Sequence, residues 1–218
     1  MAGKLRLYHF ISSTRAEGPG LRAGLWVQGC PRHCKGCAAT ATWDFEAGYE
    51  ESIDNLTNKI LSIPELDGIT IAGGEPFCQA AALAELLGKL KERRPDFSSI
   101  CFSGWRLAEL KELNLKGIND LLAKTDLLID GPYIESLAST ARPLVGSSNQ
   151  EFHFLTSRLE RWKDTWENTI NKLEIRVMPD GRIAANGMIP GEILERLLTL
   201  DYKKGDNQDG KVLRELWH

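Results

Sequence analysis

Three cysteines within eight residues carry the clearest chemistry in this sequence. Cys30, Cys34 and Cys37 follow a C-x3-C-x2-C spacing, and the whole chain holds five cysteines. Pro31 and Gly36 disfavour a regular helix here, so we expect a loop that turns the three thiols toward one centre. Clustered thiolates are ligands for soft metals and for iron–sulfur clusters.

The loop has no fourth cysteine, and this limits the kinds of metal site that it can form. A structural zinc site takes four protein ligands, whereas a catalytic site leaves one position open. An iron–sulfur cluster on three cysteines likewise leaves one iron free to bind a small molecule. The alternative is a zinc site completed by another ligand such as His33, but zinc sites usually use C-x2-C pairs.

Composition and charge indicate an ordinary globular chain. The 218 residues have 42% hydrophobic and 26% charged residues and a net charge of −3, which does not favour nucleic acid or an anionic membrane as partner. No stretch approaches the ~18 apolar residues of a membrane span, and the first residues lack a signal-peptide pattern. We therefore expect a cytoplasmic protein without a membrane segment, in which clustered cysteines bind metal rather than form disulfides.

Alternating strand and helix patterns predict the scaffold that positions the cysteines. Strands are expected at 5–11, 21–28, 68–72, 98–103, 126–130, 151–156 and 172–178. Helices are expected at 52–63, 79–94, 106–124, 157–168 and 190–200. This order favours an α/β fold with a mainly parallel sheet. We expect one domain over residues 1–200 and a polar tail over 201–218.

Polar or glycine-rich segments follow four of the predicted strands. The cysteine loop follows the second, and Gly73–Pro76, Ser103–Trp105 and Asp130–Pro132 follow the next three. Ligands of parallel α/β sheets gather at the carboxyl ends of strands, so these segments are expected to meet. Glycines let the backbone approach a ligand closely, and Glu75 and Asp130 would offer carboxylates to a cationic amine.

On these residues the sequence resembles the radical S-adenosylmethionine enzymes, because it combines the C-x3-C-x2-C loop with Gly73-Gly74-Glu75-Pro76. Within that superfamily it is most similar to the glycyl-radical-enzyme activases that act on anaerobic ribonucleoside-triphosphate reductase. The segments that carry this narrower resemblance are Glu17–Arg22, Val27–Cys30, Cys34–Cys37, Thr42–Trp43, Asp130–Tyr133 and Gly146–Gln150. Ala39, where this branch usually has asparagine, and the chain after Gln150 depart from the pattern.

The resemblance implies a cofactor set and a reaction. Cys30, Cys34 and Cys37 would hold three irons of a [4Fe-4S] cluster, and the fourth iron would bind the amino and carboxylate groups of S-adenosylmethionine. Reductive cleavage of that cofactor would give a 5′-deoxyadenosyl radical, which takes a hydrogen atom from a glycine of the partner enzyme. Flavodoxin or ferredoxin would supply the electron. No catalytic residue is expected beyond the cluster and the cofactor.

Further residues are candidates for cofactor contact. Gly73, Gly74, Glu75 and Pro76 would border the methionyl amine, and the remaining candidates are Ser103, Asp130 and Arg176. Plain structural roles compete with these assignments: Asp130 could cap a turn, Ser103 could end a strand, and Arg176 could form a salt bridge. Cys78 and Cys101 are expected to be small core residues.

We therefore expect an incomplete (β/α)6-type partial barrel, mainly parallel and open on one side to admit a large protein substrate. The expected function is that of an anaerobic radical S-adenosylmethionine oxidoreductase that activates a glycyl radical enzyme. Three alternatives remain open: an activase of another glycyl radical enzyme, a small-molecule enzyme similar to a deazapurine-forming synthase, and a non-catalytic iron–sulfur or zinc protein.

Overall fold

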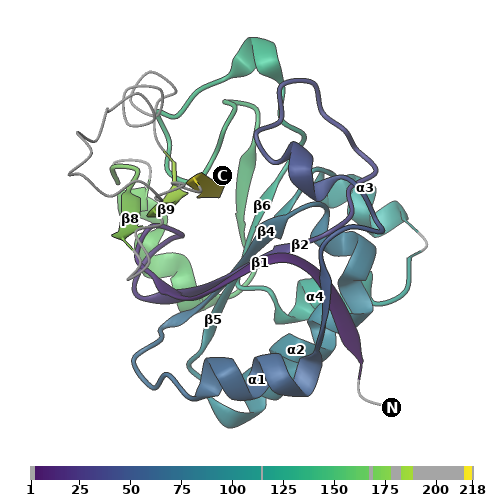
Figure 1. The fold of residues 1–218 in the computed structure, drawn as a ribbon. Helices are drawn as coiled ribbons and strands as arrows, with labels where there is room; N and C mark the ends of the chain where they lie inside the picture. The colour runs from purple at the N-terminus through teal and green to yellow at the C-terminus, as the bar shows by residue number, and fades with distance from the viewer. Residues whose placement is uncertain (1–2, 114, 167–168, 178–182, 189–213, 218) are drawn as a thin grey trace, which may run out of the picture.

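A seven-stranded sheet forms the centre of the molecule. The computed structural model describes residues 3–113, 115–166, 169–177, 183–188 and 214–217. The strand order is β3-β1-β2-β4-β5-β6-β7 (Figure 1). The central strands run parallel and are β2 (Arg22–Val27), β4 (Gly68–Gly73), β5 (Ser98–Ser103) and β6 (Leu127–Asp130). The predicted α/β fold with a parallel centre is confirmed.

Antiparallel strands flank this parallel centre on both sides. β1 (Lys4–Thr14) pairs with β2 and with β3 (Tyr49–Ser52), and β7 (Glu151–Phe154) pairs with β6. The sheet begins at β3 and ends at β7, which are not neighbours, so it is open. The sequence did not predict β3, because its residues, Tyr-Glu-Glu-Ser, lack an apolar alternation and lie at an exposed edge.

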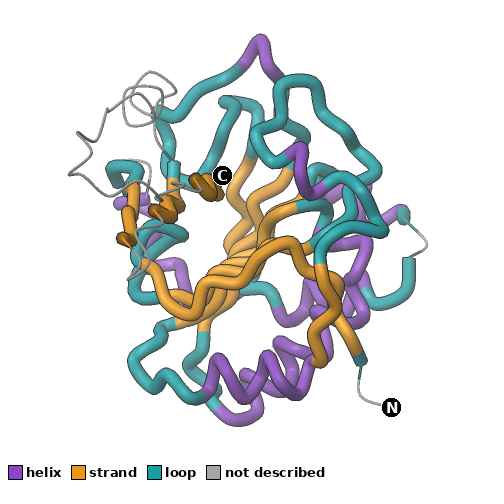
Figure 2. Tube along the Cα trace, in the orientation of Figure 1, coloured by secondary structure: helices purple, strands orange, loops and turns teal. Residues whose placement is uncertain are grey.

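Helices cover one face of the sheet (Figure 2). The main ones are α1 (Ile53–Leu61), α2 (Ala80–Arg93), α3 (Leu107–Glu112) and α4 (Ile118–Lys124). As predicted, Ser52 caps α1, since its hydroxyl accepts a 3.1 Å hydrogen bond from the Asn55 amide. The remaining short helices are η1 (Thr40–Thr42), η2 (Pro76–Gln79), η3 (Glu135–Leu137), η4 (Ser157–Trp162) and α5 (Lys163–Trp166).

The helix predicted over 106–124 is in fact two helices. Gly117 separates them with φ +88°, a value that side-chain-bearing residues rarely adopt. A Cβ at Gly117 would lie 2.4 Å from the Ala81 Cα of α2. The glycine therefore allows α4 to begin in close contact with α2, and the continuous periodicity of the sequence hides this break.

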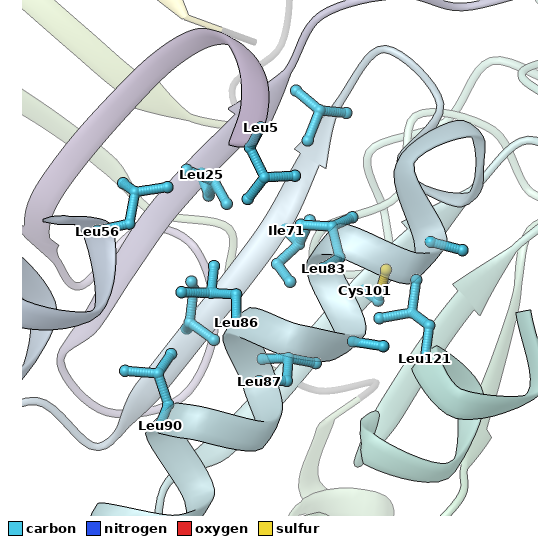
Figure 3. Packing of buried hydrophobic residues seen from close by; sticks show 14 of the residues in the cluster. Leu5, Leu25, Leu56, Ile71, Leu83, Leu86, Leu87, Leu90, Cys101 and Leu121 are labelled. Carbon is cyan, nitrogen blue, oxygen red and sulfur yellow. The ribbon is translucent and has the colours of Figure 1, made fainter. Parts of the chain in front are cut away.

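The main hydrophobic core lies between the helices and the sheet (Figure 3). The leucines of α2 at i, i+3, i+4 and i+7 are all fully buried, which confirms the predicted amphipathic helix; they are Leu83, Leu86, Leu87 and Leu90. They pack in one cluster with strand residues such as Leu25, Ile71 and Cys101. Cys101 is thus the core residue that was expected, whereas Cys78 is only half-buried.

The opposite face of the sheet has its own smaller apolar cluster. Ile100 and Ile129 belong to it, whereas their neighbours Cys101 and Leu128 belong to the helix-side core. Successive strand residues point to opposite faces, so this alternation assigns each strand-end residue to a face. Leu144, Val145 and Leu159 complete the smaller cluster from the chain that follows β6.

A second, three-stranded sheet is formed late in the chain. It comprises β8 (Leu173–Val177), β9 (Ile183–Gly187) and β10 (Arg214–Trp217), with β8 antiparallel and β10 parallel to β9. β8 confirms the strand predicted at 172–178. β9 was not predicted, and β10 lies within the expected polar tail. The helix predicted at 190–200 lies outside the described residues.

Arg22 joins three parallel strands at their amino ends. This side chain is fully buried, and its guanidinium donates to Thr70 Oγ1 at 2.8 Å, Ser98 Oγ at 2.8 Å and the Ile69 carbonyl at 2.7 Å. The acceptors come from β4 and β5, whereas Arg22 begins β2. The Glu17–Arg22 segment noted in the sequence therefore ends in a structural clamp.

Replacing this clamp should destabilise the fold. In Arg22→Leu, buried acceptors lose their donor, and we expect the free energy of unfolding to fall by about 3 kcal/mol or more. Arg93→Leu, at the exposed end of α2, is the matched control and should change it little. Urea denaturation measures the free energy of unfolding of both variants. Equal losses in the two variants would contradict a stabilising role for Arg22.

Candidate functional site

Hydrogen bonds to the carbonyls of a later segment hold the start of the cysteine loop. The Gly29 amide donates to the Thr42 carbonyl at 2.8 Å, and the Cys30 amide donates to the Trp43 carbonyl at 3.1 Å. The His33 ring stacks on Trp43 with centroids 4.5 Å apart. The Thr42–Trp43 motif thus has a structural explanation, and His33 packs on an aromatic ring beside the loop.

The three thiols of the loop are available as ligands. Cys30, Cys34 and Cys37 are free and half-buried. Free thiols at this spacing can hold an iron–sulfur cluster or a metal ion, so the loop is compatible with the predicted ligand set.

Cys78 follows Gly73–Pro76 and lies outside the cysteine loop. It is half-buried, and burial raises the pKa of its thiol to about 12. Burial also raises the pKa of Cys30. Because coordination to iron deprotonates a thiol outright, these shifts do not rank the cysteines as ligands. The C-x3-C-x2-C spacing keeps Cys30, Cys34 and Cys37 as the candidate ligand set.

The Gly-Gly-Glu-Pro segment is attached to the cysteine loop through the backbone. The Gly74 amide donates to the Val27 carbonyl and the Glu75 amide to the Gly29 carbonyl, both at 2.8 Å. A Cβ at Gly74 would lie 2.3 Å from the Gly29 oxygen, and Gly73 has φ +101°. Both glycines are therefore required for this contact, and the two motifs meet as the sequence predicted.

The Glu75 carboxylate connects the end of β4 to the end of β5. It is 1% exposed and accepts hydrogen bonds from the Gly104 amide at 2.7 Å, the Phe77 amide at 3.0 Å and Ser103 Oγ at 3.1 Å. Burial raises the pKa of Glu75 to about 7, while these hydrogen bonds act in the opposite direction. The carboxylate faces these protein donors, and a contact between Glu75 and a cationic amine stays a prediction. Pro76 begins η2 directly after it.

A cavity of about 170 Å³ lies beside the joined strand ends. Gly73, Gly74 and Ser103, three of the predicted cofactor contacts, line it. Trp26 and Phe102 add aromatic walls that the sequence did not single out. The cavity therefore opens on the sheet face opposite the helices. A small molecule bound there can approach Gly73 and Gly74, the glycines that contact the cysteine loop.

Glu17 is a candidate that the sequence analysis missed. It lines the cavity, is 8% exposed, and accepts a 2.9 Å hydrogen bond from Asn186 Nδ2. Burial raises the pKa of this carboxyl group. Glu17 belongs to the Glu17–Arg22 motif, which was the available signal, but nothing in the sequence showed that β9 would approach it.

Four predicted cofactor contacts do not line the cavity: Glu75 and Pro76, which lie beside it in the chain, and the more distant Asp130 and Arg176. Asp130 lies on the helix side of the sheet with Leu128, and one of its carboxylate oxygens accepts a hydrogen bond from the Leu107 amide at the start of α3. Arg176 donates to the Ser13 carbonyl and pairs with Glu174. The plain structural roles, a cap for Asp130 and a salt bridge for Arg176, are the ones that the geometry shows.

The Gly146–Gln150 segment supports the loop that follows β6. The Gln150 side-chain oxygen accepts from the Gly146 amide at 2.9 Å, and Asn149 Nδ2 donates to the Pro132 carbonyl at 2.8 Å. That loop reaches the cysteine loop, since Lys35 Nζ lies 2.9 Å from the Glu135 carboxylate. The hydrogen bonds of Gly146–Gln150 therefore stabilise the loop that lies beside the cysteines.

Comparisons with known proteins agree with this site. The family model described as a 4Fe-4S single cluster domain matches residues 16–153. The chain belongs to this family. The anaerobic ribonucleoside-triphosphate reductase-activating protein of Vibrio cholerae is 31% identical over 146 residues, which cover 64% of this chain and 92% of the relative. Its namesake from Enterobacteria phage T4 is 29% identical over 138 residues, which cover 62% and 84%.

The resemblance to the activating-protein family, and with it the assignment as a radical S-adenosylmethionine enzyme, is confirmed by these relatives. The crystal structure of QueE from Escherichia coli superposes with a TM-score of 0.41 and 17% identity, over 56% of this chain and 68% of QueE. This likeness is too slight to support a functional conclusion. None of the helices in the described residues is long and apolar enough to cross a membrane.

The connection made by Glu75 can be tested by removing its charge. In Glu75→Gln, the side-chain NH2 group must face the backbone amide of either Gly104 or Phe77. Both groups are donors, so one of the present hydrogen bonds is lost. We expect the free energy of unfolding to fall by about 1–3 kcal/mol, with faster hydrogen exchange at Gly104. Glu65→Gln, at an exposed position, is the control. If Glu75→Gln unfolds and exchanges like Glu65→Gln, the hydrogen bonds to the Glu75 carboxylate do not stabilise the fold.

Proposed function

We propose that this chain reductively cleaves S-adenosylmethionine at a [4Fe-4S] cluster and generates a glycyl radical on anaerobic ribonucleoside-triphosphate reductase. The observation that carries the proposal is the attachment of the cysteine loop to Gly73–Pro76 beside a cavity. The name of the relatives supports the choice of partner. Flavodoxin or ferredoxin is the proposed electron donor, and the cytoplasm the proposed compartment.

In this proposal the residues of the chain bind and position rather than react. Cys30, Cys34 and Cys37 hold the cluster, which supplies the electron for cleavage when bound. The backbone carbonyls at Gly73 and Gly74 would accept hydrogen bonds from the cofactor's amino group. Glu75 keeps Ser103 and Gly104 at a fixed distance from these glycines, so that the cofactor's position is set before reaction.

The walls of the cavity protect a reactive centre from solvent. Trp26 and Phe102 line it with aromatic surface, and Leu144 adds an aliphatic side chain. Apolar walls exclude water, which would otherwise compete as a partner for reactive groups. We further propose that the open sheet acts as a partial barrel around the cavity, and that its unclosed side admits a glycine-bearing loop of the partner.

The decisive experiment uses electron paramagnetic resonance on the partner. The chain is reconstituted anaerobically with iron and sulfide, reduced, and incubated with S-adenosylmethionine and the anaerobic reductase of the same organism. A glycyl doublet that requires every component supports the proposal. Cleavage of the cofactor without a doublet on the reductase would redirect the search to another glycyl radical protein or a small molecule. One zinc per chain without cofactor cleavage would refute the enzymatic proposal.

The ligand assignment has its own test. Cys34→Ala should abolish cluster assembly, measured by iron content and visible absorption, because it removes one of three thiolates from the loop. Circular dichroism should remain that of a folded chain, since Cys34 is outside the core. Cys101→Ala, in the core but away from the loop, should still assemble the cluster. Retained cofactor cleavage by Cys34→Ala would contradict the assignment.

A further inference from the structure

Three potential metal ligands project from the same face at the end of the β6–β7 pair. Asp130 lies opposite Glu151, and Leu128 lies opposite His153, in the antiparallel register. Opposed residues and residues two apart share a face, so Asp130, Glu151 and His153 all point to the helix side. One ligand atom from each lies within 4.8 Å of the other two.

Two of these ligand groups have unused hydrogen-bonding capacity in a buried setting. The Asp130 side chain is 2% exposed, and its Oδ1 has no hydrogen-bond partner among the described residues. His153 Nε2 lies 2.9 Å from Asp130 Oδ2 but is not oriented to form a hydrogen bond with it. Buried polar atoms without partners are costly, and a bound cation would satisfy both.

The charge balance also favours a cation. Asp130 and Glu151 are both acidic, and Arg106 Nη1 lies 2.8 Å from Glu151 Oε1. The two carboxylates therefore face the single guanidinium of Arg106. Arg106 thus fixes the exposed Glu151 carboxylate, one oxygen of which lies within 4.8 Å of the ligand atoms of Asp130 and His153.

We propose that Asp130, Glu151 and His153 form a site for a divalent transition-metal ion. One imidazole and two carboxylates suit Mn²⁺, Fe²⁺ or Zn²⁺, whereas Mg²⁺ and Ca²⁺ prefer oxygen ligands alone. The site is separate from the cysteine loop, and its ligands lie on the sheet face opposite the cavity. The proposal therefore does not depend on the proposed function.

A metal ion here would stabilise the segment between β5 and α3. Asp130 already accepts from the Leu107 amide, and Arg106 already pairs with Glu151. The same segment begins at Ser103 and Gly104, which hold the Glu75 carboxylate. The ion would thus join β6, β7 and the start of α3, and fix one wall of the cavity from outside.

Titration of the full-length chain with Mn²⁺ tests the site. Electron paramagnetic resonance measures free aqueous Mn²⁺, and we expect the wild-type chain to remove one equivalent. His153→Ala and Glu151→Gln each lose a ligand and should bind at least about tenfold more weakly. Glu65→Gln should bind like the wild type. The Cys34→Ala chain should also bind one equivalent, because the cysteine loop is not involved.

Further variants separate ligand loss from misfolding. His153→Asp replaces one ligand by another and should retain Mn²⁺ binding, whereas His153→Ala should not, with circular dichroism showing both chains folded. The proposal is overturned if the wild-type chain binds no Mn²⁺ even when the ion is present at millimolar concentration. It is equally overturned if binding is unchanged in both His153→Ala and Glu151→Gln, because the ion would then bind elsewhere. Loss of stability in His153→Ala without Mn²⁺ binding by the wild type would identify a metal-free Asp130–His153 pair.

Discussion

The buried Glu75 carboxylate is the interaction on which the rest of the site depends. Through its amide the residue is bound to Gly29, which precedes the cysteines, and through its carboxylate to Gly104 at the end of β5. One residue therefore sets the spacing of three strand ends. Burial opposes its ionisation and raises its pKa to about 7, so the hydrogen bonds to Gly104, Phe77 and Ser103 are what hold a carboxylate there.

Much of this architecture follows from local patterns in the sequence. The leucine spacing of α2 specifies a buried stripe, and the glycines at 73 and 74 specify a close backbone approach. These features act over a few residues, so the chain need not be folded to recognise them. The meeting of the cysteine loop with Gly73–Pro76 was predictable too, because neighbouring parallel strands end at the same edge.

Other features depend on which face a strand-end residue occupies, and the sequence does not determine this. A shift of one residue moves a side chain to the other face. Asp130 follows Ile129 and so lies on the helix side, away from the cavity, although its position along the strand suggested a cofactor ligand. The contacts of Glu17 and Arg176 were not predictable for a related reason: their partners, Asn186 and Ser13, are distant in the sequence.

The two ends of the sheet are held by interactions that respond differently to ionic strength. At the amino ends of the parallel strands, the buried Arg22 guanidinium donates hydrogen bonds to neutral acceptors. Its acceptors are hydroxyl and carbonyl oxygens in the interior, where mobile ions do not reach. At the other end, the exposed Lys35–Glu135 pair links the cysteine loop to the loop after β6, and dissolved salt screens such pairs. Added salt should therefore weaken the contact between the cysteine loop and the loop after β6, while the amino ends of the parallel strands stay joined.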